Sequence, residues 1–185
     1  MQTDKASPWT GAKPHRLAAR PGAKALALTI AAAWATGAWS LAPGEPAPAC
    51  SVPLLEGGRT VNVADFRGSV VYLDFWASWC GPCRQSFPFM NELQQELAGK
   101  GLSIVAVSVD KTADEARGFL ANYPAQFAIA LDTAGACPKT YELQGMPTSY
   151  VIDRKGIVRA VHAGFRNSDK AAIRAQLLQA LGESR

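Results

Sequence analysis

The stretch VVYLDFWASWCGPC, residues 70–83, runs from an apolar strand directly into two cysteines three positions apart. Two cysteines at this spacing can close a small disulfide ring. If Cys83 lies in the first turn of a helix, Cys80 sits at the helix N-terminus, where unpaired backbone N–H groups and the macrodipole favour a thiolate. The thiolate is the species that attacks disulfides. The stretch therefore predicts a site for dithiol–disulfide exchange.

Strand and helix patterns alternate along the rest of the chain. After the strand, apolar residues at helical spacing predict a helix over about 82–98, with Pro88 inside it and Gly99 at its end. Further strands are expected over 59–63, 102–109, 127–131, 148–153 and 157–163, and further helices over 112–122, over 137–143 and from about 168. The last helix is expected to bury Ile173, Leu177, Leu178 and Leu181. This order predicts an α/β domain with three layers.

The N-terminal part differs from the rest in charge and hydropathy. Residues 1–24 carry five basic side chains and one acidic one, and residues 25–42 carry no charge. A basic flank before an apolar run predicts a secretory signal or a transmembrane anchor, and either one exports the part that follows. Residues 43–49, which contain three prolines, are expected to be a linker, and residues 50–185 the folded domain.

The balance of charge in the folded part excludes one class of function. Residues 43–185 hold 14 basic and 14 acidic side chains, so the net charge of +4 lies in the N-terminal flank. A nucleic-acid-binding domain needs its basic residues on the folded surface. Nucleic acid is therefore not an expected partner.

Cys50 and Cys137 lie outside the CGPC motif. In an exported protein a spare pair of cysteines is more often bonded than free, so these two are expected to form a structural disulfide. Closing a separation of 87 residues would stabilise the fold by roughly 4 kcal/mol through loop-closure entropy. The alternatives are two buried free thiols and a lipid-modified Cys50.

Two further runs connect the motif with a known family. FWASWCGPC (75–83), Pro88 five positions after Cys83, and GMPTSYVID (145–153) together resemble the thioredoxin superfamily. The frame GEPAPACSVPLLEGGRTVNVADFRGSVVYLDFWASWC (44–80) and the 30-residue gap between Asp110 and Tyr141 resemble, more narrowly, the exported TlpA/ResA-like thioredoxins. The resemblance covers about residues 44–182. It implies a thioredoxin fold, a central mixed sheet flanked by helices, with an N-terminal β extension and an inserted helix–strand segment.

The resemblance also implies roles for the residues of the motif. Cys80 would be the nucleophile, and Cys83 would resolve the mixed disulfide. Gly81 and Pro82 would set the turn between the two cysteines, in a dipeptide typical of reducing thioredoxins. Trp79 would partly shield Cys80 and contact the client.

Three residues outside the motif complete the expected site. Asp74 would be the buried acid beneath the disulfide, whose pKa is raised by desolvation and which accepts the Cys83 proton. Its alternative is a strand-edge acid paired with a basic side chain. Pro147 would be a cis-proline that turns the backbone of Met146 outward, so that an extended client segment pairs with it as an added strand. Its alternative is an ordinary trans proline.

The chain departs from the family pattern at two positions. Ser86 stands where ResA-like proteins often carry a glutamate, and Ala106 stands where thioredoxins place a lysine near the buried aspartate. Without that cation the pKa of Asp74 would rise further. The exchange reaction remains the expected one, with its own dependence on pH.

Together these residues predict an exported thiol–disulfide oxidoreductase that reduces disulfides of client proteins, for example in cytochrome c or metalloprotein maturation. No cofactor or metal is expected. The resemblance implies a membrane electron donor of the DsbD/CcdA type as the second partner. It also implies a domain facing the periplasm, anchored in the inner membrane through residues 25–42 or released if that segment is cleaved.

Two alternatives to a reductant remain. A disulfide oxidase or isomerase of the same fold is the nearer one, and the Gly81-Pro82 pair argues against it. A copper-binding metallochaperone is an alternative from another class. It would need ligands beyond the two cysteines, and His162 is the only histidine after residue 24.

Overall fold

Five strands form the central sheet of the computed structural model, which describes residues 41–182. Their order across the sheet is β5 (Ala128–Leu131), β4 (Leu102–Ser108), β3 (Val70–Trp76), β6 (Thr148–Ile152) and β7 (Val158–Ala163). Strand β3 pairs in parallel with β4 and antiparallel with β6. The strand that leads into CGPC therefore lies at the centre of a mixed sheet.

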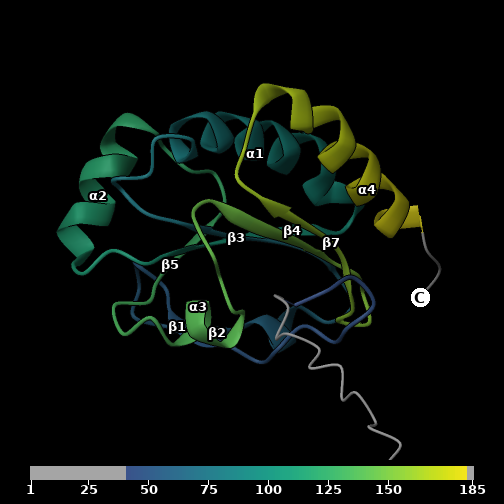
Figure 1. Cartoon of the computed structure of the whole chain (residues 1–185), viewed down its shortest axis with the longest axis horizontal. Coiled ribbons are helices and arrows are strands. Elements are labelled where there is room, and N and C mark those ends of the chain that lie inside the picture. The colour runs from purple at the N-terminus through teal and green to yellow at the C-terminus, as the bar shows by residue number, and fades with distance from the viewer. Residues whose placement is uncertain (1–40, 183–185) are drawn as a thin grey trace, which may run out of the picture. The chain divides into compact units, whose positions relative to one another are not determined.

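Helices and a small second sheet cover the two faces of this sheet (Figure 1). On one face lie α1 (Cys83–Leu97), α2 (Ala113–Asn122) and α4 (Lys170–Gly182). On the other lie α3 (Ala136–Thr140) and the antiparallel pair β1 (Ser51–Pro53) and β2 (Thr60–Asn62). Short 3₁₀ helices span Val63–Phe66, Ala98–Lys100 and Asn167–Asp169. The predicted α/β fold, a mixed sheet between layers with an N-terminal β extension, is confirmed.

Alternation along β3 divides the core into two halves. Tyr72 and Trp76 belong to the half that contains α1 and both cysteines of CGPC, whereas Leu73 and Phe75 pack on the opposite face of the sheet. All seven residues of β3 are buried, which is why the sequence pattern alone did not assign the faces. Because side chains alternate along a strand, Asp74 points to the same face as Tyr72 and Trp76.

The helix starts follow from local hydrogen bonds. Thr112 caps α2, since its side chain accepts from the Glu115 N–H while the Glu115 carboxylate accepts from the Thr112 N–H. This reciprocal pair satisfies two of the backbone donors that a helix start leaves free. Pro88 lies inside α1, as expected, on an exposed position.

The last two helices differ in part from their predictions. Leu178, expected in the core, is 43% exposed, and Ala180 is buried instead. Ile173, Leu177 and Ala180 recur at helical spacing on one face of α4, and position 178 falls about 100° away from Leu177. Helix α3 ends at Thr140 rather than at 143, and Glu142 adopts a positive φ of 52° that stops the helix.

Residues 43–49 are not a free linker. The Gly44 N–H donates to the Val158 carbonyl, the Val158 N–H donates to Glu45, and the Ala47 N–H donates to Gly156. Prolines are tolerated here because the segment lies at the edge of the sheet, where every second backbone group needs no partner. This part of the predicted linker therefore belongs to the folded domain and covers the start of β7.

The predicted basic flank (1–24) and nearly all of the apolar segment (25–42) lie outside the described residues. Between residues 41 and 182, no helix has the length and apolar character needed to cross a bilayer.

Candidate active site

The CGPC turn places the two cysteines at the junction of β3 and α1. Cys80 and Cys83 form a disulfide, with their Cα atoms 5.4 Å apart. Helix α1 begins at Cys83, and the Cys83 N–H donates to the Cys80 sulfur over 3.3 Å. A free N–H at the positive end of the helix dipole thus points at the sulfur of Cys80. In the reduced protein this arrangement favours the thiolate at Cys80.

Exposure separates the roles of the residues around the turn. Cys83 is fully buried and Cys80 is 3% exposed, so Cys80 is the sulfur nearer to solvent. Trp79 is 68% exposed, more than a shielding role implies. Gly81 and Pro82 are also exposed. The turn therefore projects from the surface with an aromatic side chain ready to contact another protein.

Asp74 is a buried acid on the cysteine side of the sheet. Within residues 41–182 its Oδ2 atom has no hydrogen-bond partner, and burial raises its pKa well above the ordinary value. In register it lies between Ala106 of β4 and Ser149 of β6, neither of which is charged. No ion pair among residues 41–182 involves Asp74. The alternative of a paired strand-edge acid is therefore wrong.

Tyr72 and Ser86 complete the surroundings of this acid and of Cys83. The Tyr72 hydroxyl donates to Ser149 over 2.8 Å, and burial together with the nearby charge of Asp74 raises the tyrosine pKa. Ser86 is buried, and its hydroxyl donates to the carbonyl of Cys83 over 3.2 Å. The position that a glutamate often occupies in ResA-like proteins thus holds a neutral group, and Asp74 is the acid of this site.

Asp110 is a site residue that the sequence analysis did not identify. Its buried carboxylate accepts the Ser78 N–H at 3.0 and 3.1 Å, the Ser78 hydroxyl at 2.8 Å and the Ser108 hydroxyl at 2.8 Å. Ser78 lies two residues before Cys80, so Asp110 fixes the path of the chain between β3 and the motif. The available signal was an acid just after β4, since the ends of neighbouring parallel strands meet at one edge of a sheet.

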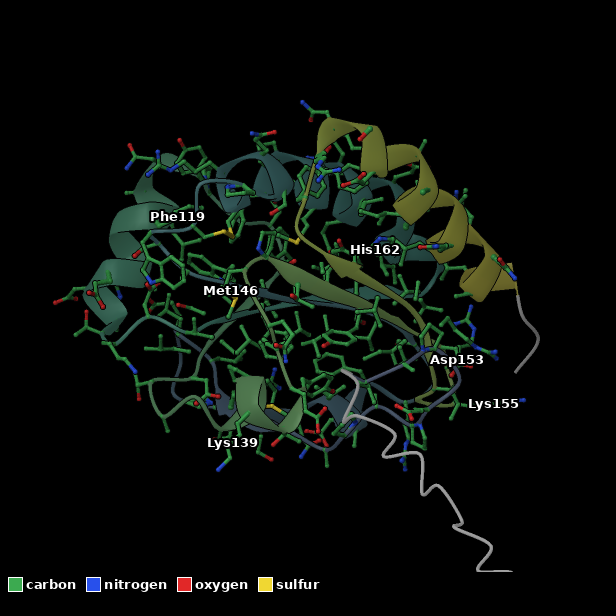
Figure 2. The ribbon with its side chains drawn as sticks, viewed as in Figure 1. Phe119, Lys139, Met146, Asp153, Lys155 and His162 are labelled. Carbon is green, nitrogen blue, oxygen red and sulfur yellow. A yellow bond between two sulfur atoms is a disulfide. The ribbon has the colours of Figure 1, made fainter. Side chains whose placement is uncertain are left out.

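A groove of about 320 Å³ opens beside the motif. Trp79 and Met146 form part of its lining. The remaining lining residues come from the β4–α2 connection, from the first turn of α2 and from the start of α3: Val109, Asp110, Lys111, Glu115, Gly135 and Pro138. Met146 lies on the connection between α3 and β6 (Figure 2). Trp79 and Met146, predicted as client-binding residues from distant parts of the sequence, thus line the same groove.

The backbone next to Pro147 is available for pairing. The Met146–Pro147 peptide bond is cis, and Pro147 is buried. The Pro147 carbonyl accepts from the Gly164 N–H, and the Gly145 carbonyl accepts from the Thr148 hydroxyl. Within residues 41–182, neither the N–H nor the C=O of Met146 hydrogen-bonds to the protein. Both groups can therefore bind an extended segment of another chain.

Cys50 and Cys137 form the second disulfide, with their Cα atoms 5.5 Å apart. Both are buried in the half of the core opposite to CGPC. The bond joins the residue before β1 to helix α3. No free cysteine remains among the described residues.

His162 lies apart from the motif. It points towards α4, where its Nε2 atom is 2.7 Å from the Gln176 side-chain oxygen (Figure 2). Among residues 41–182 there is no group of three or more His, Cys, Asp and Glu side chains placed to hold a metal ion.

Strand β3 leads into the CGPC disulfide at the start of α1, carries the buried Asp74 on the same face, and pairs with β6, which follows the cis Met146–Pro147 bond. This combination defines the thioredoxin-fold thiol–disulfide oxidoreductases. The chain belongs to the Redoxin family, whose sequence profile matches residues 42–177.

Known relatives and solved structures agree with this class. The thiol-disulfide oxidoreductase ResA of Bacillus thuringiensis subsp. konkukian is 39% identical over 115 residues, which cover 62% of this chain and 66% of that protein. ResA of Bacillus subtilis is 32% identical over 76% of this chain and 78% of its own length. A crystal structure from Chlorobium tepidum, of a candidate thiol:disulfide interchange protein DsbE, has 51% identity and a TM-score of 0.74. The matched region covers 77% of this chain and 100% of the Chlorobium tepidum chain.

Proposed function

We propose that this protein reduces disulfides in exported client proteins through Cys80 and Cys83. The observation that supports this most strongly is the Cys83 N–H, which donates to the Cys80 sulfur at the start of α1. It selects Cys80 as the thiolate, while the fully buried Cys83 is kept for the second step.

The reaction proceeds in two exchanges. The Cys80 thiolate attacks one sulfur of the client disulfide, so that a Cys80–client bond forms and the other client sulfur leaves as a thiolate. Cys83 then loses its proton, attacks the Cys80 sulfur and displaces the first client thiolate. The client gains two electrons as two thiolates; the proton lost by Cys83 and one proton from solvent balance these two charges, and the protein is left with the Cys80–Cys83 disulfide seen in the structure.

Asp74 supports the second exchange as a base. A carboxylate with an ordinary pKa would be a weak base at neutral pH, whereas one with a raised pKa binds a proton more readily. Its place on the cysteine face of β3, with no competing cation or hydrogen bond at Oδ2, suits it to take the Cys83 proton. Asp74 is therefore proposed as the proton acceptor of the resolving step.

The groove lined by Trp79 and Met146 is proposed as the client-binding site. It begins next to Cys80, and the free backbone groups of Met146 offer one donor and one acceptor to an extended segment that flanks the client disulfide. Exposed Trp79 adds apolar contact area beside the reacting sulfurs.

A trapping experiment with the full chain tests this function. In Cys83→Ser, Cys80 can attack but nothing resolves the mixed disulfide, so a covalent adduct with a disulfide-containing protein such as insulin should accumulate. In Cys80→Ser, no adduct should form. An adduct of equal yield on Cys83 in the Cys80→Ser variant would contradict the assignment of the nucleophile, and no adduct in either would contradict the function.

We further propose that the domain works outside the cytoplasm, anchored by residues 25–42 or released after their cleavage. The basic flank, the uncharged segment and the use of a second, non-catalytic disulfide support this location. Re-reduction then requires a dithiol donor in the membrane, of the DsbD/CcdA type. Fusion of residues 1–42 to alkaline phosphatase, which is active only when exported, tests the location: an inactive fusion would contradict it.

A further inference from the structure

We propose that the Cys50–Cys137 disulfide, together with Asp132, is a specificity-determining element that holds α3 as a fixed wall of the client groove. This inference rests on the proposed function and adds to it. The bond would set the rate of exchange with protein disulfides and leave exchange with small disulfides unchanged. Its own sulfurs take no part in the reaction and stay oxidised.

Cys137 lies between two residues that line the groove. Gly135 lies two positions before it and Pro138 one position after it, and both line the groove next to Trp79 and Met146. Cys137 itself is buried in the core on the opposite side of the sheet from CGPC. Gly135 and Pro138 of this short segment therefore face the groove, whereas Cys137 between them faces the core and forms the second disulfide.

Helix α3 cannot hold this wall in place by its own stability. It spans five residues, Ala136–Thr140, and isolated helices shorter than about 12–15 residues are marginal in water. Its position depends on bonds to other parts of the chain.

Three kinds of bond hold the wall. The Cys50–Cys137 disulfide ties α3 to the start of β1. The buried Asp132 carboxylate accepts the Gly135 N–H at 2.9 Å and the Cys137 N–H at 2.7 Å, which fixes the backbone at the start of α3. Just past the helix, the Tyr141 hydroxyl donates to the Pro48 carbonyl over 2.9 Å. Two of these bonds reach back to residues 48–50, so the segment before β1 anchors the groove wall.

Loss of the disulfide would affect large and small substrates differently. A protein client touches the groove beyond its reacting sulfurs, and a loosened wall must be ordered again each time a client binds, which reduces affinity. A small disulfide reaches only the exposed turn at Cys80 and does not depend on α3. The expected signature is therefore a change in selectivity without a change in the chemistry of Cys80 and Cys83.

The test compares Cys50→Ala/Cys137→Ala with the wild type, both as the full chain. Wild type is reduced under conditions that leave Cys50–Cys137 oxidised, checked by alkylation and peptide mapping. Rate constants are then measured with insulin and with bis(2-hydroxyethyl) disulfide. We expect the rate constant for insulin to fall about 10-fold, through weaker binding, which corresponds to about 1.4 kcal/mol. The rate constant for the small disulfide and the Cys80–Cys83 potential should stay within about 2-fold and about 10 mV of wild type.

A second pair of variants guards against loss of the fold. Asp132→Asn keeps the disulfide but weakens the acceptor for the Gly135 and Cys137 N–H groups, and it should lower the insulin rate selectively. Its matched control is Asp153→Asn. Asp153 is a buried acid that accepts the Lys155 and Ile157 N–H groups in a turn which does not line the groove, so its loss should leave selectivity unchanged.

The outcomes separate this inference from the function on which it rests. A wild type that reduces neither substrate would contradict the proposed function. Equal losses for insulin and the small disulfide, in both the double variant and Asp132→Asn, would overturn the specificity role in favour of general damage to the site. Unchanged rates with both substrates would show that the second disulfide only stabilises the fold.

Discussion

The two disulfides of this protein have similar burial but opposite surroundings. The cysteines of the CGPC pair are 3% and 0% exposed, and those of the second pair are 5% and 3% exposed. The first pair closes a separation of 3 residues at the start of a 15-residue helix, and the second closes a separation of 87 residues. Accessible area alone therefore does not tell a reactive disulfide from a structural one.

What differs is the set of groups around each sulfur. Cys80 accepts an N–H at a helix N-terminus and adjoins exposed Trp79 and a groove, whereas the backbone N–H of Cys137 donates to Asp132 within a core made mainly of aliphatic side chains. The first site stabilises a thiolate, whereas no donor among residues 41–182 hydrogen-bonds to the sulfur of Cys50 or Cys137. The role of each disulfide is therefore decided by the hydrogen-bond donors around its sulfurs and by whether another protein can reach it.

The largest difference between the two disulfides is expected when Cys80, the nucleophile of the CGPC pair, is removed. Cys80→Ser should lower the rate of insulin reduction by about 1,000-fold or more, because a serine hydroxyl does not form the attacking anion at neutral pH. The Cys50→Ala/Cys137→Ala variant keeps the reaction, with the smaller loss described above. The two are compared in one insulin turbidity assay; similar losses in both would contradict the division of roles.

For the free energy of unfolding we expect the opposite order: loss of Cys50–Cys137 should have the larger effect and loss of Cys80–Cys83 the smaller one. Loop-closure entropy predicts that Cys50→Ala/Cys137→Ala lowers the free energy of unfolding by about 4 kcal/mol, and Cys80→Ala/Cys83→Ala by about 1.5 kcal/mol. The reason is the length of chain that each bond constrains in the unfolded state. Urea titration of both variants at the same pH measures the difference, and a larger loss for the CGPC variant would contradict the account.

Asp74→Asn tests the buried acid that lies on the same side of the sheet as the Cys80–Cys83 disulfide. The folded-state pKa of Asp74 is raised, so its contribution to stability is present below about pH 4, near its ordinary pKa, and is lost as the pH rises through the folded-state pKa. The variant should therefore gain stability relative to wild type as the pH rises, by about 1–3 kcal/mol. Urea titrations from pH 4 to 9 measure this gap.

The same variant should slow the resolving step. Wild-type exchange should accelerate as Asp74 loses its proton with rising pH, and Asp74→Asn should lack this limb of the pH profile. Stopped-flow measurement of mixed-disulfide decay follows the step directly. A variant that loses stability relative to wild type as the pH rises would contradict the raised pKa of Asp74. Identical pH profiles of mixed-disulfide decay in the two proteins would show that Asp74 is not the acceptor.

Ser78→Ala should give the smallest effect. It removes the hydroxyl donor to Asp110 but leaves the backbone N–H bond in place, so the free energy of unfolding should fall by about 1 kcal/mol. Urea titration measures this change in the free energy of unfolding. Ser108→Ala removes the other hydroxyl donor to the same carboxylate, but from β4, and serves as the matched control. Only Ser78→Ala should also change the rate with small disulfides, because only Ser78 belongs to the CGPC loop.

Local patterns predicted most of the fold because they depend on near neighbours. The β3 strand, the CGPC turn, the Thr112 cap and the hairpin after Pro147 each follow from residues close in sequence. The error at Leu178 arose because Leu177 and Leu178 are adjacent and only the packing of α4 decides which of them faces the core.

The parts that sequence alone did not supply depend on distant residues. Ser78 and Asp110 are 32 positions apart and meet only because β3 and β4 are in parallel register. Residues 43–49 were expected to be a linker because they contain three prolines, but Gly156 and Val158, more than 100 positions later, hydrogen-bond to their backbone. The groove likewise combines four separate segments, so no local pattern could outline it.

A redox titration of the full chain, in which alkylation and peptide mapping follow each cysteine pair separately, measures the reduction potential of each disulfide. We expect Cys80–Cys83 to titrate at about −250 mV or lower, and Cys50–Cys137 to be still bonded at that potential. A Cys80–Cys83 potential near about −120 to −180 mV would contradict the reducing role and indicate an oxidase or isomerase. Reduction of Cys50–Cys137 before or together with Cys80–Cys83 would contradict the separation of the two disulfides into structural and reactive bonds.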